Sequence, residues 1–148
     1  MNRIRVPQSV LGETFAQLRS CGRGPHECVA YLVGPADAEY VVDEVVHPDH
    51  VSSLGGYQLV GCWITRFWFD LARRQQSVRI QVHTHPGPSE HSPTDEEWAL
   101  IHTSGFLSLV IPYFALGPVG LEDANLALRR GDGGWRSVRP DSLIELVS

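Results

Sequence analysis

The stretch SVRIQVHTHPGPSEHSPTD, residues 77–95, decides the fold. Its first part, residues 77–82, alternates in hydropathy and is rich in β-forming residues, which predicts a central strand. The strand runs directly into HTHP, residues 83–86. Pro86 ends it, because proline cannot donate a hydrogen bond to a sheet ladder. Ser92, followed by proline and acidic residues, is typical of a helix start.

Working outward, the spacing of apolar residues predicts the other helices and strands. We expect helices over residues 8–20, 57–74 and 92–103. We expect strands over residues 27–33, 39–46, 77–82, 106–112, 113–116, 125–130 and 135–139. Helices and strands alternate first and strands dominate later, which predicts an α/β sandwich with a mixed sheet. Without a repeat or a linker, residues 1–148 are expected to form a single domain.

Two helices are expected to bury apolar stripes. The first stripe is Val10, Leu11, Phe15 and Leu18, and the second is Leu59, Trp63, Ile64, Phe67, Trp68 and Leu71. Phe69 lies beside the second stripe, so at least one aromatic ring there must face away from the core. Such a patch is expected to bind a partner or a second copy of the chain.

Composition excludes several classes of function. The chain has 148 residues, of which 43% are hydrophobic, and its net charge is −5. This charge disfavours a broad electrostatic contact with nucleic acid or an anionic membrane. Its apolar runs are too short to span a bilayer, and we find no secretory signal. The odd count of 3 cysteines, without a CxxC pair, argues against a disulfide framework and favours a reducing, cytoplasmic location.

The pattern HxHP followed by SxxD indicates a metal-binding site. His83 and His85, two residues apart on a strand, point to the same face with Cβ atoms roughly 6–7 Å apart. Asp95 lies in the first turn of the next helix, which can fold back over the strand end. Two histidines, a carboxylate and a water form a catalytic zinc site. Two simpler interpretations stay open: HxH pairs are common on exposed strands, and Ser92 with Asp95 resembles a capping box.

Together, Glu27 at the head of ECVAYLVG, then HTHP, then SPTD resemble the JAMM motif of the MPN family of zinc metalloproteases. The resemblance implies a three-layer α/β sandwich, in which helices flank a curved mixed β-sheet. It also implies hydrolysis of isopeptide or peptide bonds after the C-terminal glycine of ubiquitin or a ubiquitin-like protein. The short loop before Ser92 is similar to that of bacterial members.

Carried over residue by residue, the resemblance implies that His83, His85 and Asp95 bind one Zn²⁺ per chain. Glu27 would act as general base on the activated water, and Ser92 would help to stabilise the oxyanion. The implied partners are a ubiquitin-like protein or its conjugates, together with their activating and conjugating enzymes.

Two alternative functions stay open within this resemblance: C-terminal processing of a sulfur-carrier protein, and a non-catalytic binding scaffold. A nucleic-acid deaminase is disfavoured because the HxE and PCxxC signature of that chemistry is absent from the sequence. For His47 and His50 we favour a surface loop over a second metal site. Cys28 and Cys62 are interpreted as ordinary core residues.

Overall fold

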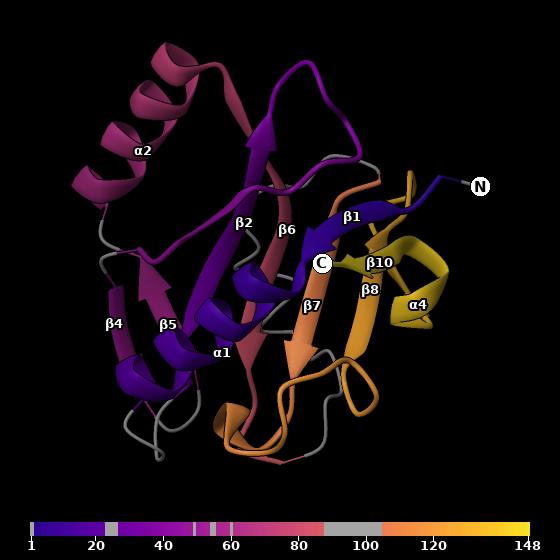
Figure 1. Ribbon diagram of the computed structural model, residues 1–148. Coiled ribbons are helices and arrows are strands. Elements are labelled where there is room, and N and C mark those ends of the chain that lie inside the picture. Colours follow the sequence, from indigo (N-terminus) through magenta and orange to yellow (C-terminus); the bar gives the residue numbers. More distant parts are fainter. Residues whose placement is uncertain (1, 23–26, 49, 54–55, 60, 88–104) are drawn as a thin grey trace.

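A mixed β-sheet forms the centre of the structure (Figure 1). The computed structural model describes residues 2–22, 27–48, 50–53, 56–59, 61–87 and 105–148. Within these residues the main sheet has 6 strands in the order β3-β2-β6-β7-β8-β9. They are β2 (Val29–Pro35), β3 (Glu44–Val46), β6 (Gln76–Thr84), β7 (Leu107–Ile111), β8 (Asn125–Arg129) and β9 (Trp135–Val138). β6 and β7 are parallel, and the other neighbouring pairs are antiparallel.

Among the described elements, two helices cover opposite faces of this sheet. Helix α1 (Gln8–Gly22) lies in front of the strands in Figure 1, and α2 (Gly61–Arg74) packs on the opposite face. Side chains that alternate along β2 divide between the two helices, as the pleat of a strand requires. Cys28, just before β2, and then Ala30 and Leu32 pack in the α1 cluster, while Val29, Tyr31 and Val33 pack with α2. The expected α/β sandwich is confirmed.

The predicted apolar stripe of α1 is confirmed, because its four residues are at most 7% exposed. The stripe of α2 is narrower than expected. Phe67 and Leu71 are buried, but Trp68 is 39% exposed and Phe69 is 79% exposed. None of the described helices combines the length and the apolar character that a membrane crossing requires.

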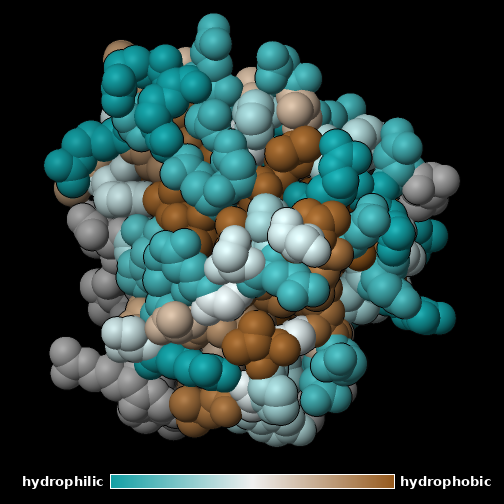
Figure 2. All heavy atoms as spheres, in the orientation of Figure 1, coloured by the Kyte–Doolittle hydropathy of each residue, from teal (hydrophilic) through white to brown (hydrophobic). Residues whose placement is uncertain are grey.

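A second, smaller sheet joins the two ends of the described chain. β1 (Ile4–Pro7) pairs in parallel with β10 (Ile144–Val147), which follows the short helix α4 (Pro140–Leu143). Val6 and Ile144 from this pair are buried in the cluster around α1. Apolar side chains also reach the surface on this face, among polar ones (Figure 2). The sequence analysis missed both strands, since each is only 4 residues long.

The strand predicted over residues 39–46 is wrong in its first half. Only Glu44–Val46 pairs with β2, whereas Val41 forms a parallel bridge with Arg5 beside β1. The chain crosses closely over Gly34 at this point: a Cβ atom added to Gly34 would lie 1.8 Å from the carbonyl oxygen of Val41. Glycine therefore permits a crossing that the hydropathy pattern does not reveal.

The predicted start of the second long helix is also wrong. A hairpin of β4 (His50–Ser53) and β5 (Gly56–Leu59) occupies the region before it, and α2 begins only at Gly61. Leu59 therefore belongs to a strand. A short apolar run fits either type of element, and periodicity alone cannot choose between them.

The strand predicted over residues 113–116 is wrong as well. Tyr113–Ala115 form a tight turn, η1, with positive φ angles of 56°, 53° and 60°. The predicted strands on either side are confirmed as β7, β8 and β9, with small changes in their ends.

Candidate functional site

His83 and His85 lie side by side at the carboxyl end of β6. His83 pairs with Val29 of β2 and with Val110 of β7, so it lies in the middle of the sheet. The two imidazole centroids are 5.1 Å apart, and the rings are inclined at 59°. His83 is fully buried and His85 is 9% exposed. The pair is therefore packed inside the protein, which disfavours the exposed-strand interpretation of this motif.

Backbone hydrogen bonds fix the chain around His85. Its N–H donates to the carbonyl of Ile111 at 3.0 Å, and its own carbonyl accepts from the N–H of Phe114 at 2.8 Å. The N–H of Tyr113 donates to the carbonyl of Gly87 at 3.1 Å. These bonds dock η1 against the end of β6. The three residues of η1 hold left-handed conformations, which are unfavourable outside glycine, beside His85.

Arg19 of α1 forms hydrogen bonds with η1 and with the chain that follows it. The guanidinium of Arg19 donates to the carbonyls of Ala115 and Gly117, the latter at 2.5 Å. Hydrogen bonds from a charged donor are shorter and stronger than neutral ones. Arg19 thus connects the helix on one face of the sheet to the turn that positions His85.

Glu27 is buried next to the same end of the sheet. It is 6% exposed and directly precedes Cys28. The backbone N–H of Cys28 donates to the hydroxyl of Thr84 at 2.9 Å, and its carbonyl accepts from the N–H of Thr84 at 3.0 Å. The paired register of β2 and β6 ends with Val29 opposite His83. Glu27 precedes Val29 by two residues and His85 follows His83 by two, which in extended chain puts both on the α2 face. A buried carboxylate is costly unless other groups compensate it.

Ser92 and Asp95 lie outside the described residues, as does the helix predicted over residues 92–103. Their predicted roles stay predictions. Of the five residues that the motif singles out, the structure brings together Glu27, His83 and His85 at one end of β2 and β6.

The sequence analysis missed a row of buried polar residues below the histidines. Tyr31, Gln81 and Ser108 are register partners across β2, β6 and β7, and all three are fully buried. Burial raises the pKa of the Tyr31 hydroxyl well above its ordinary value. The alternation of the three strands could have revealed this row once their pairing was known.

On the opposite face, Cys21 and Cys28 form a disulfide with their Cα atoms 6.2 Å apart. The expectation of a chain without a disulfide is therefore wrong. α1 returns the chain so that its last turn lies beside the start of β2, which the count of cysteines could not indicate. Cys62 is exposed rather than in the core. The cytoplasmic location stays a prediction.

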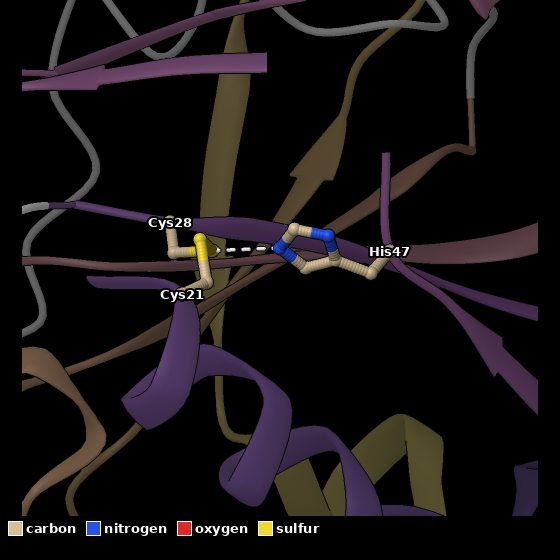
Figure 3. Close-up of side chains that lie close together, drawn as sticks. All are labelled: Cys21, Cys28 and His47. Carbon is tan, nitrogen blue, oxygen red and sulfur yellow. Dashed lines mark hydrogen bonds between the residues drawn. A yellow bond between two sulfur atoms is a disulfide. The ribbon is translucent and has the colours of Figure 1, made fainter. Parts of the chain in front are cut away.

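His47 also departs from its predicted surface loop. It is half-buried, and its Nε2 atom lies 3.2 Å from the Sγ atom of Cys28 (Figure 3). The three side chains come from different segments: the end of α1, the residue before β2 and the residue after β3.

Solved structures share this fold. A protein from Desulfitobacterium hafniense matches with a TM-score of 0.72 at 18% identity, covering 98% of this chain and 93% of that one. A JAB1/MPN domain protein from Archaeoglobus fulgidus matches with a TM-score of 0.57 at 18% identity, covering 99% and 100% of the two chains.

Sequence similarity is stronger to one curated relative. The protein named "Probable metalloprotease y4jG", from Sinorhizobium fredii, is 32% identical over 152 residues, which span 98% of this chain and 93% of that protein. The chain belongs to the JAMM/MPN family. No protein-family model matches this JAMM/MPN chain.

The described residues of this JAMM/MPN protein fit a metal ion. His83 and His85 supply two imidazole rings within one buried pair. Imidazole nitrogens are common ligands of catalytic zinc sites.

Proposed function

We propose that this chain is a zinc-dependent peptidase or isopeptidase that cleaves after the C-terminal glycine of a ubiquitin-like protein. Membership of the JAMM/MPN family and the likeness to a probable metalloprotease support the coarser statement, a metal-dependent peptidase. The observation that carries the proposal is the buried pair His83 and His85 with Glu27 at the same sheet end.

In this proposal His83 and His85 hold the metal together with Asp95. Zinc held there supplies a Lewis acid and lowers the pKa of water to about 7. Glu27 accepts a proton from the attacking water on its carboxylate and then transfers it to the leaving amine. Ser92 donates a hydrogen bond to the carbonyl oxygen as negative charge develops there. A positioned general base typically contributes 10²–10⁴-fold to the rate.

The position of the site also suits an extended peptide. β6 and β7 are parallel, so their carboxyl ends open at the same edge of the sheet, beside His85 and η1. We infer that the C-terminal tail of the substrate lies there in extended form, across the carboxyl ends of these two strands. A tail that ends in two glycines would fit a slot too narrow for side chains.

The exposed rings of Trp68 and Phe69 lie on α2, the helix on the histidine face of the sheet. We infer that this patch contacts the folded part of the substrate protein. Apolar patches rimmed by polar residues are typical of protein-binding surfaces.

The test compares Glu27→Gln with Glu39→Gln, which changes an exposed glutamate away from the site. Glu27→Gln is expected to retain zinc, measured by inductively coupled plasma mass spectrometry. It is also expected to lose cleavage by about 10²–10⁴-fold, because glutamine cannot accept the proton. Glu39→Gln should behave as wild type. Cleavage by Glu27→Gln at the wild-type rate would refute the role of general base.

The substrates are ubiquitin-like proteins with a fluorogenic amide at the diglycine end, lysine-linked conjugates, and sulfur-carrier precursors with extra C-terminal residues. Cleavage of conjugates supports the proposal, whereas cleavage of the sulfur-carrier precursors alone assigns the chain to precursor processing. A zinc-loaded wild-type protein that cleaves none of them would overturn the proposed substrate class.

A further inference from the structure

Cys21, Cys28 and His47 form a second cluster with metal-binding chemistry, on the α1 face of the sheet and away from the histidine pair. Their ligand atoms all lie within 4.8 Å of one another. Figure 3 shows the imidazole of His47 directed at the two sulfur atoms. Among the described residues, this is the cluster of three such side chains that could hold an ion.

The donor set matches zinc. Two thiolates and an imidazole are the ligands of many zinc sites, and soft thiolates select zinc over magnesium or calcium. Zinc lies about 2.3 Å from sulfur and about 2.0–2.1 Å from nitrogen, in a tetrahedron whose ligand atoms are roughly 3.5–3.8 Å apart. Nε2 of His47 is already 3.2 Å from Sγ of Cys28. When the disulfide is reduced, the two sulfur atoms are no longer bonded and can separate toward this spacing.

The cluster is open to solvent on one side. A shallow pocket of about 440 Å³ is lined by Cys21 and His47 together with residues from one face of α1. Those residues are Glu13, Ala16, Gln17 and Ser20. Two of the three ligands therefore face an entry path, and a water molecule can complete the tetrahedron. Two thiolates balance the charge of the divalent cation.

We propose that Cys21, Cys28 and His47 bind a second Zn²⁺ when the cysteines are reduced, and that the disulfide is the oxidised, metal-free form of this site. On binding, the two thiols release two protons and form two zinc–sulfur bonds. A small-molecule disulfide converts the zinc-bound form back to the oxidised, metal-free form. It accepts two electrons and two protons and leaves as two thiols, while the Cys21–Cys28 bond forms and Zn²⁺ departs.

The test uses the full chain, reduced and stripped of metal, titrated with Co²⁺ as a spectroscopic probe. A cobalt–thiolate site gives a sulfur-to-cobalt charge-transfer band, which the His83 and His85 site cannot give because it has no thiolate. We expect this band in the reduced wild type, and its loss after oxidation. Cys28→Ser and Cys21→Ser should also lose it, while His47→Ala should shift the cobalt bands and weaken binding.

Cys62→Ser is the matched control, because Cys62 is exposed and outside the cluster. It should retain the band. The absence of the band in the reduced wild type would overturn the proposal, as would its survival in Cys21→Ser with circular dichroism unchanged. Zinc content separates the two sites: the reduced chain should carry one more zinc than the oxidised chain, and His83→Ala should leave that difference intact.

Discussion

Tyr31 is a large buried side chain on the histidine face of the sheet. Its ring stacks on Trp63 of α2 with a centroid distance of 6.3 Å, and it packs at a tilt of 32° against Phe67 with a centroid distance of 5.6 Å. Within the described residues its hydroxyl has no hydrogen-bond partner. A buried hydroxyl without a partner loses its bonds to water and destabilises the fold.

Tyr31→Phe is therefore expected to leave stability unchanged at neutral pH or to raise it, by at most about 1–3 kcal/mol. The variant should also resist alkali better. Burial raises the pKa of Tyr31 in the folded state, so wild-type stability is complete below the ordinary tyrosine pKa of about 10 and falls as the pH rises above it. Urea unfolding at pH 7 and pH 11 measures both effects.

Tyr113→Phe is the control, since Tyr113 is 52% exposed. It should keep the alkaline loss of stability seen in the wild type. A Tyr31→Phe variant that is less stable than the wild type at pH 7 would mean that the hydroxyl has a partner outside the described residues.

At the scale of single residues, the sequence predicts the face on which a side chain lies better than it predicts contacts between residues far apart in the chain. The shared face of His83 and His85 follows from the period of a strand. Glu27 is one of 17 acidic residues, and only the resemblance singles it out. The Cys21–Cys28 bond depends on where α1 ends relative to β2, which no local pattern contains.

At the scale of elements, the end of α2 shows how a helix is stopped without glycine. Arg74 donates hydrogen bonds of 2.9 Å to both Asp70 and Glu44, which connects α2 to β3. Gln75 follows with a φ angle of 55°, and its N–H donates to the carbonyl of Ala72. This left-handed residue turns the chain directly into β6, the strand that carries both histidines.

Gln75→Gly is expected to stabilise the protein by about 1 kcal/mol, because glycine adopts positive φ without the steric cost of a Cβ atom. Gln75→Ala keeps the Cβ atom and should change stability by less than about 0.5 kcal/mol. Thermal unfolding of the two variants against wild type measures the difference. If glycine proved less stable than alanine, the left-handed conformation would not be the cause.

Left-handed backbone and pairing between distant residues explain which elements the sequence could not predict. Apolar spacing locates α1, β2, β6 and β7, whose side chains are buried over several turns or pleats. It fails at η1, where left-handed φ angles are imposed by backbone contacts to His85 and Gly87. It also fails at the β4–β5 hairpin, because pairing between strands decides that element.

At the scale of the molecule, the main sheet separates two clusters of side chains with metal-binding chemistry. The histidine pair lies on the α2 face, and the cluster of two cysteines and His47 lies on the α1 face. Glu27 and Cys28 are neighbours in the chain, so a single peptide bond connects the proposed base to the disulfide.

The stability of the whole arrangement depends on the β1–β10 pair. Ile144 is 3% exposed and belongs to the cluster that α1 covers. Ile144→Ala is expected to cost about 2–5 kcal/mol, since it removes buried methyl groups and leaves a cavity. Urea unfolding measures this loss. Leu116→Ala, at a side chain that is 60% exposed, should change stability by less than about 0.5 kcal/mol. Equal effects of the two substitutions would show that the pair does not support the core.

The β1–β10 pair can form only after the last described strand has been synthesised. Among the described elements β1 leaves the ribosome first, and the strand that pairs with it in parallel leaves last. During synthesis, α1 and the strands of the main sheet emerge while β1 still lacks this neighbour. The register between Ile4 and Ile144 closes a loop that spans most of the described chain, and the entropic cost of closing a loop rises with its length. Until Ile144 emerges, Val6 and its neighbours in the α1 cluster lack the cover that Ile144 gives them in the folded protein.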